Sequence, residues 1–84
     1  MNLIERASTF ARNAHIAQFR EWTGEPYWNH LHEVAELVRN SGLPDDVVAA
    51  AYLHDTIEDT KVTFQDLETH FGLVIAEMVL MVTD

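Results

Sequence analysis

The run His54-Asp55-Thr56-Ile57-Glu58-Asp59-Thr60 concentrates more reactive side chains than any other part of the chain. If a helix continues through it, spacings of three and four residues bring its imidazole and three carboxylates onto neighbouring faces. Like charges at these spacings repel one another, and more strongly as burial lowers the effective dielectric constant. A bound divalent cation removes that conflict, and the mixture of imidazole and carboxylate suits Mn²⁺, Fe²⁺ or Zn²⁺.

Spacing alone leaves a second interpretation of this run open. In that case His54 makes a hydrogen bond within the core, and the three acids form the solvated end of a helix. The metal interpretation also needs a further ligand, because neighbouring residues on a helix point about 100° apart and His54 and Asp55 cannot enclose an ion alone. The remaining imidazoles are those of His15, His30, His32 and His70.

These four imidazoles differ in their expected surroundings. His15 lies beside the apolar positions of the first helix and is expected to be half-buried with its hydrogen bonds satisfied. His70 ends a helix, where the negative end of the helix dipole stabilises a positively charged imidazole. His30 and His32 begin a helix from which either could point at the buried helix, and His32 is expected to be the more solvated of the two.

Two helices are predicted in the first half of the chain. Apolar residues recur every three or four positions from Leu3 to Ala17, which predicts an amphipathic helix that ends near Phe19. Pro26 then marks a loop. Asn29 offers an N-cap for a second helix over about 30–41, and Gly42 follows where a helix end favours a left-handed residue.

Three further helices are predicted in the second half. A proline and two acids at 44–46 open a helix whose body, Val47 to Leu53, is apolar on every side and is therefore expected to be buried. Thr63 and Asp66 have the spacing of a capping box for a short helix to about His70. Gly72 ends it, and residues 73–82 form the fifth helix. The predicted fold class is an all-α bundle of about five helices.

The fifth helix, Leu73 to Val82, is almost entirely apolar and needs cover on most of its circumference. Too little apolar surface is predicted elsewhere in the sequence to provide it. We therefore expect either a second chain against this helix, as in a homodimer, or a chain that forms part of a longer domain.

Composition excludes several classes of function. The chain has 84 residues, no cysteine and a formal charge of -9, so it lacks the basic surface of nucleic-acid binders and any thiolate metal site. Its longest apolar stretch is shorter than the roughly 20 residues of a membrane span. The first residues show no secretion signal. A cytoplasmic location is the expectation.

Several blocks of the sequence resemble the first half of an HD-superfamily metal-dependent phosphohydrolase, especially the RelA/SpoT-type guanosine tetraphosphate hydrolase domain and its small single-domain relatives. The most specific block is the His54–Thr60 run preceded by three alanines. The other blocks are Ala14-His15-x-x-Gln18-x-Arg20, Thr23-Gly24-Glu25-Pro26-Tyr27-x-x-His30, Phe71-Gly72 and Val82-Thr83-Asp84. On this resemblance, residues 1–84 are the N-terminal half of an HD domain.

The resemblance implies a role for each matching residue. His30, His54 and Asp55 would bind one divalent metal, commonly manganese. Glu58 and Asp59 would activate water and transfer protons, and Arg20 would contact a guanine nucleotide. The implied activity is removal of pyrophosphate from the ribose 3′ position of a guanosine polyphosphate.

Some positions depart from the family pattern. Leu31 follows the first metal histidine where the family has proline, and Glu21 follows Arg20 where the family often has a basic residue. The family's fourth metal ligand, an aspartate on a later helix, has no counterpart among the 84 residues. The alternative function is therefore a truncated or degenerate HD module that binds a partner or self-associates without catalysis.

Overall fold

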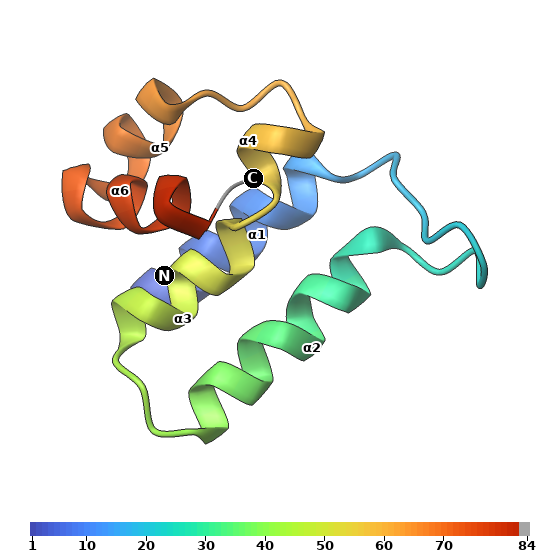
Figure 1. The fold of residues 1–84 in the computed structure, drawn as a ribbon, viewed down its shortest axis with the longest axis horizontal. Coiled ribbons are helices and arrows are strands. Elements are labelled where there is room, and N and C mark those ends of the chain that lie inside the picture. Colours follow the sequence, from blue (N-terminus) through green and yellow to red (C-terminus); the bar gives the residue numbers. More distant parts are fainter. Residues whose placement is uncertain (83–84) are drawn as a thin grey trace.

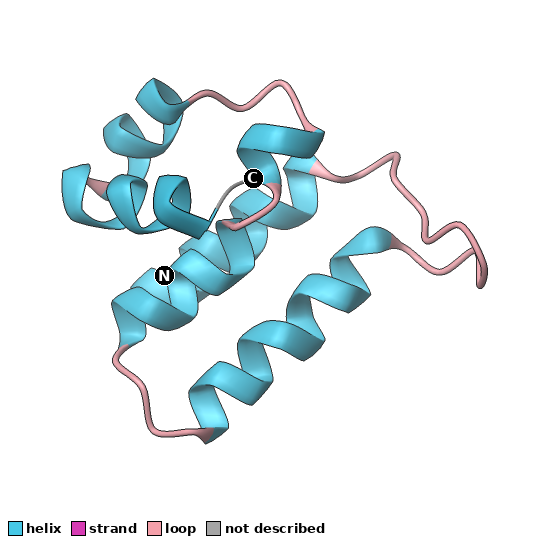
Figure 2. Ribbon diagram, viewed as in Figure 1, coloured by secondary structure: helices cyan, strands magenta, loops and turns pink. Residues whose placement is uncertain are grey.

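The computed structural model describes residues 1–82, which form an all-α bundle (Figure 1; Figure 2). Thr83 and Asp84, the end of the last matching block, lie outside the described residues. The predicted fold class is confirmed, and one short helix, α4, is added to the five expected. The helices are α1 (Leu3–Ala14), α2 (Tyr27–Asn40), α3 (Asp45–Leu53), α4 (Thr56–Asp59), α5 (Phe64–Phe71) and α6 (Leu73–Val82).

Helix α3 lies at the centre of the bundle, as its uniformly apolar sequence predicts. It packs against α1, α2 and α6, while α5 and α6 pack against each other (Figure 1). Leu53 at its end is fully buried together with Leu31 of α2, and the α1 residues Ala7 and Ala11 allow the close approach of α1. The buried centre of the fold therefore ends at the run of acids and histidine that follows Leu53.

The end of α1 was predicted too late. The helix ends at Ala14 instead of near Phe19, and His15 and Gln18 close a turn through a backbone hydrogen bond of 2.9 Å. Phe19 then pairs with Pro26 in an isolated antiparallel bridge. The apolar periodicity continues past Ala14, but Phe19 is 61% exposed, so no core contact sustains the helix there.

The start of α2 was predicted too late by three residues. Pro26 occupies the N-cap position, where its missing N–H costs nothing, and Tyr27 is the first helical residue. Asn29, the expected N-cap, lies inside the first turn. The helix ends at Asn40, and Gly42 has the predicted left-handed backbone with φ 80°.

The α5–α6 hairpin follows the sequence closely. Thr63 accepts a hydrogen bond from the Asp66 backbone and donates its own backbone N–H to the Asp66 carboxylate, which completes the predicted capping box. Gly72 separates the two helices with φ 88° and ψ 163°. This conformation is essentially restricted to glycine.

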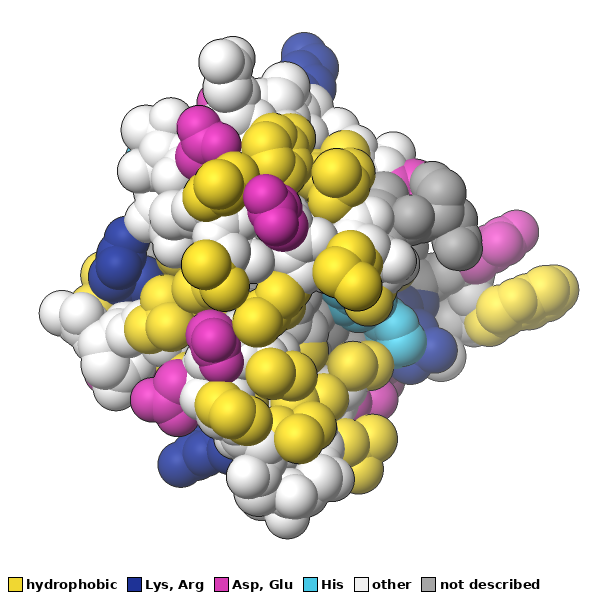
Figure 3. All heavy atoms as spheres, turned by 60° about the vertical axis from the view of Figure 1, so that its left-hand side comes forward, with side chains coloured by type: hydrophobic (Ala, Val, Ile, Leu, Met, Phe, Trp, Pro, Cys, Tyr) yellow, Lys and Arg dark blue, Asp and Glu magenta, His cyan; other side chains and the backbone are white. Residues whose placement is uncertain are grey.

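An apolar face is left exposed beside α6, as its sequence predicted (Figure 3). Met81 is 85% exposed and Val74 is 65% exposed. A groove of about 430 Å³ lies between α2, α3 and α6, and apart from His54 its walls are apolar: Val34, Val38, Val47, Ala50, Ala51, Met78, Met81 and Val82. Among the described residues, no helix has the length and apolar character to cross a membrane, and the cytoplasmic location stays a prediction.

Candidate metal centre

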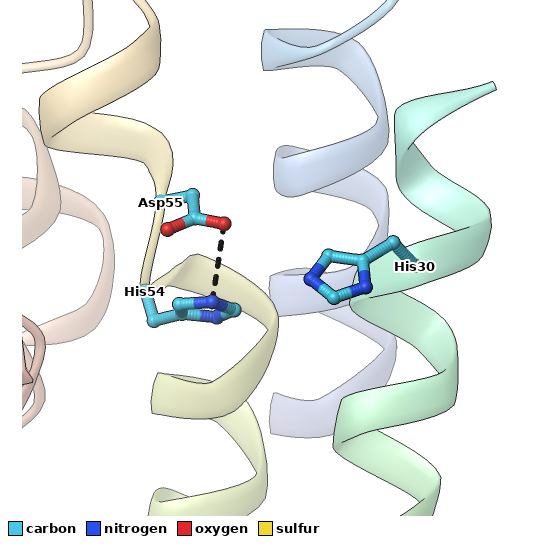
Figure 4. Close-up of side chains that lie close together, drawn as sticks. All are labelled: His30, His54 and Asp55. Carbon is cyan, nitrogen blue, oxygen red and sulfur yellow. Dashed lines mark ion pairs between the residues drawn. The ribbon is translucent and has the colours of Figure 1, made fainter. Parts of the chain in front are cut away.

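Three side chains, one from helix α2 and two from the turn after α3, meet beside the end of α3 (Figure 4). His30 points across from the first turn of α2, and His54 and Asp55 follow the last residue of α3. One ligand atom from each lies within 4.8 Å of the other two. All three side chains are partly buried, with those of His54 and Asp55 only 23% and 19% exposed.

The tautomer of His54 is fixed by its backbone contact. Its Nδ1 lies 2.6 Å from the carbonyl oxygen of Ala51, and because a carbonyl can only accept, Nδ1 carries a proton. The other nitrogen, Nε2, lies 3.1 Å from Oδ2 of Asp55. With Nδ1 directed at the carbonyl, Nε2 and the carboxylate both offer lone pairs on the same side, where a cation could be held by both. This donor set therefore fits a divalent metal.

Asp55 also receives a hydrogen bond from outside its own helix. The hydroxyl of Tyr27 donates to Oδ2 of Asp55 at 2.5 Å. Burial raises the pKa of the Tyr27 hydroxyl well above its usual range, and the Asp55 carboxylate raises it further. The hydroxyl therefore keeps its proton at neutral pH and can donate to the carboxylate.

The body of the buried helix ends at Leu53, as predicted, and the helical geometry considered for the run after it is interrupted. Helix α3 ends at Leu53, a turn follows, and the single-turn helix α4 starts at Thr56. Thr56 is fully buried and its hydroxyl donates to the Leu53 carbonyl at 2.8 Å, which stabilises this turn. The Asp59 backbone N–H still bonds to the Asp55 carbonyl at 2.9 Å, so these two acids keep the helical spacing of four residues across the turn.

The three other site residues predicted from the resemblance lie outside the metal cluster. Glu58 and Asp59 are exposed on α4, and Arg20 is exposed in the loop between α1 and α2. The charges of Asp59 and Arg20 nevertheless act on the Tyr27 hydroxyl, the first raising its pKa and the second lowering it. These two charges therefore act on the hydroxyl that contacts Asp55, and the structure records no such link for Glu58 among the described residues.

The remaining histidines do not join the cluster. His15 is only 2% exposed, more buried than predicted, and its Nε2 has no hydrogen-bond partner among residues 1–82, which corrects the expectation of a satisfied half-buried ring. The His32 side chain is 43% exposed, in keeping with the expected solvation, although its Nδ1 lies 2.6 Å from the Tyr52 hydroxyl and its ring stacks on Trp28. His70, at the end of α5, contacts the ring of Phe10.

Tyr27 and Gln18 contact the functional segment, and the sequence had assigned no role to either. Tyr27 lies three residues before His30, a spacing that places both on one face of α2, with their ring centroids 5.6 Å apart. That spacing could have identified Tyr27. Gln18 donates to the backbone carbonyl of Asp59 at 2.7 Å across the fold, a contact that local spacing does not reveal.

Comparison with known proteins identifies the family. Residues 7–84 match the HD domain family. The chain belongs to this family. It is 41% identical over 80 residues to guanosine-3′,5′-bis(diphosphate) 3′-pyrophosphohydrolase of Aquifex aeolicus (strain VF5), covering 95% of this chain and 11% of the relative. It is 39% identical over 84 residues to guanosine-3′,5′-bis(diphosphate) 3′-pyrophosphohydrolase MESH1 of Danio rerio, covering 98% of this chain and 47% of the relative.

A solved structure shares the fold of this HD domain. It is described as a metazoan ortholog of SpoT that hydrolyzes ppGpp, and it superposes with a TM-score of 0.93 at 31% sequence identity. The match covers 100% of this HD domain chain and 49% of that chain. The present chain thus spans about half of the metazoan relatives and about a tenth of the bacterial one.

Proposed function

We propose that the chain is the metal-binding part of an HD-type phosphohydrolase that removes pyrophosphate from the 3′ position of guanosine 3′,5′-bis(diphosphate). The observation that carries this proposal is the convergence of His30, His54 and Asp55 at the end of α3. It is supported by the fold shared with a structure described as hydrolyzing ppGpp.

His30, His54 and Asp55 would hold the ion, with Mn²⁺ as the proposed metal. A bound divalent ion would supply a Lewis acid for both the phosphate and the attacking water. The chain has a formal charge of -9, so a cation is needed before a polyphosphate can approach it. Arg20, which is exposed and whose charge acts on the Tyr27 hydroxyl, is the proposed contact for the nucleotide.

The reaction is hydrolysis, and α4 supplies the groups for its proton transfers. The water oxygen bonds to phosphorus, the bond from phosphorus to the ribose 3′ oxygen breaks, and the leaving oxygen gains a proton. Asp59 is proposed to take part in these proton transfers because its charge is felt at the Tyr27 hydroxyl beside the metal ligands. Glu58, exposed on the same turn, is proposed to orient the attacking water.

Metal binding is tested by thermal unfolding with Mn²⁺. At a concentration of 100 times Kd, an ion that binds only the folded state stabilises it by about 2.7 kcal/mol. For a domain of this size that raises Tm by roughly 10–20 °C. We expect His54→Ala and Asp55→Ala to abolish the shift and His70→Ala, outside the cluster, to retain it. An unchanged Tm of the wild-type chain in Mn²⁺ would contradict the metal site.

Catalysis is tested separately, because three ligands can hold an ion without forming a complete pocket. The chain is incubated with Mn²⁺ and guanosine 3′,5′-bis(diphosphate), and the released pyrophosphate is measured. We expect turnover that needs the metal and that falls about 10²-fold or more in Asp59→Asn if this carboxylate transfers protons. Metal binding without pyrophosphate release would favour the non-catalytic alternative.

That alternative is self-association of a non-catalytic HD module, and the exposed apolar groove between α2, α3 and α6 favours it. The proposed occupant of the groove is the α6 helix of a second copy, whose exposed side chains are of matching apolar character. Val82 is 60% exposed and Leu80 is 51% exposed, so both copies would remove apolar surface from water.

A further inference from the structure

The segment from Asp55 to Asp59 carries a metal ligand at one end and a proposed proton-transfer group at the other, yet it has little structure of its own. It contains α4, which is only four residues long. Within the segment, the Asp59 backbone N–H bonds to the Asp55 carbonyl at 2.9 Å. A single turn is not stable without outside contacts. The positions of both functional carboxylates therefore depend on what the rest of the fold contributes.

One outside contact comes from Tyr27, whose hydroxyl donates to Oδ2 of Asp55. The Tyr27 ring is itself held between two imidazoles, with its centroid 4.9 Å from that of His15 and 5.6 Å from that of His30. The hydroxyl fixes the rotation of the carboxylate. A carboxylate offers about four lone-pair sites, so acceptor capacity remains for a metal.

The second outside contact comes from Gln18. Its Nε2 donates to the backbone carbonyl of Asp59 at 2.7 Å, and its Oε1 contacts Nδ1 of the buried His15. Because a carbonyl can only accept, the amide orientation is fixed, and His15 must then donate from Nδ1. Gln18 is thus held at both ends of its side chain.

The two contacts come from neighbouring points of one loop. The backbone N–H of Tyr27 donates to the carbonyl of Gln18 at 2.9 Å, next to the bridge between Phe19 and Pro26. Two residues that are nine positions apart in sequence are thereby joined. They reach opposite ends of the same five-residue segment.

We propose that Tyr27 and Gln18 are positioning residues of the metal centre: Tyr27 orients the metal-ligating carboxylate of Asp55, and Gln18 fixes the backbone at Asp59. The proposal rests on the proposed function, because it assigns these residues to that same site. Removing a group that orients a metal ligand by a hydrogen bond typically weakens metal affinity about 10–100-fold.

The role of Tyr27 is tested with Tyr27→Phe, which removes the hydroxyl and keeps the ring. The matched control is Tyr52→Phe, since the Tyr52 hydroxyl also bonds to a side chain, His32 at 2.6 Å, away from the cluster. Mn²⁺ affinity is measured by calorimetry, and the visible spectrum of Co²⁺ reports the ligand geometry. We expect affinity about 10–100-fold weaker and a shifted Co²⁺ band in Tyr27→Phe alone.

The outcomes separate this role from the site itself. A wild-type chain that binds neither ion would overturn the metal site and this role with it. Wild-type binding that Tyr27→Phe leaves unchanged would overturn the role of Tyr27 and leave the site standing. Equal losses in Tyr27→Phe and Tyr52→Phe would show a general structural effect and would also overturn the proposal.

The role of Gln18 is tested with Gln18→Glu, which keeps the shape but places a carboxylate against the Asp59 carbonyl. The control is Gln65→Glu, the same change at an exposed position on α5. Amide hydrogen exchange is followed at Asp59 and Thr60, whose N–H groups close the α4 turn. We expect at least tenfold faster exchange at these two amides in Gln18→Glu, with the α3 amides unchanged. Equal exchange in both variants, or faster exchange throughout the fold, would overturn this role.

Discussion

At the scale of single residues, the type of side chain and the family resemblance located the proposed metal ligands, but not the residues that contact them. The residue types from His54 to Asp59 indicated a metal site, and the resemblance to HD-superfamily hydrolases selected His30 as the further ligand. The structure brings His30, His54 and Asp55 together. The partners of these ligands were not predicted, because the contacts from Tyr27 and Gln18 span the fold. Such contacts depend on where helices end, which residue type alone does not determine.

The buried tyrosines lead to a prediction about alkaline pH. Burial raises the pKa of the Tyr52 hydroxyl, and the Glu36 carboxylate raises it further. A pKa that is higher in the folded than in the unfolded state means that the folded state holds the proton more tightly. The contribution of Tyr52 to the free energy of unfolding is therefore complete below the pKa of tyrosine in the unfolded chain, about 10. It is lost as pH rises from that value through the higher pKa of the folded state.

We expect the free energy of unfolding to fall between pH 9 and pH 11, and to fall less steeply in Tyr52→Phe. Urea unfolding at a series of pH values measures both slopes. Tyr27, whose pKa is also raised, adds to the same trend, so the slope of the Tyr52→Phe variant does not vanish. A wild-type slope equal to that of Tyr52→Phe would show that Tyr52 ionises equally easily in both states.

At the scale of helices, the elements with explicit end signals were predicted well. The capping box at Thr63 and the glycines at 42 and 72 lie where expected. The failures came at helix ends: apolar periodicity continued after the core had ended, at Phe19, and a helix expected from about residue 30 begins at Tyr27. Periodicity describes which face could be buried, and the packing of the whole chain decides how far the helix extends.

Gly72 provides a test of the α5–α6 hairpin. Its φ of 88° and ψ of 163° are unfavourable for any residue with a Cβ, although a Cβ there would meet no atom within 4 Å. The cost of Gly72→Ala is therefore backbone strain, and we expect a loss of about 1–3 kcal/mol in unfolding free energy. Urea denaturation measures it against Thr69→Ala on α5, which is expected to change stability by no more than about 0.5 kcal/mol. Equal stabilities of the two variants would mean that the hairpin relaxes to another connection.

At the scale of the whole molecule, the sequence predicted an apolar surface without cover, and the structure places it beside the metal cluster. His54 both belongs to the cluster and lines the groove between α2, α3 and α6. The sequence could not show this adjacency, because it arises from the packing of α6 against α3. Whatever covers the groove therefore also borders the proposed metal site.

Self-association through this face is opposed by charge and favoured by apolar burial. The formal charge of -9 makes two copies repel each other, while the groove and the exposed side of α6 present matching apolar surfaces. Added salt shortens the screening length from about 30 Å at 0.01 M to about 8 Å at 0.15 M. We therefore expect sedimentation velocity to show a larger average mass at the higher salt concentration and at higher protein concentration.

A matched pair of variants separates the apolar contribution from the electrostatic one. Met81→Lys adds one positive charge on the apolar face, and Trp22→Lys adds the same charge at a side chain that is 93% exposed in the loop between α1 and α2. Both changes reduce the repulsion between copies equally, but only Met81→Lys introduces a charge that must be desolvated when the face is covered. We expect association about tenfold weaker in Met81→Lys and unchanged or slightly stronger in Trp22→Lys. A wild-type chain that stays monomeric in both salts would remove the basis for self-association, and equal weakening by the two variants would place the contact elsewhere.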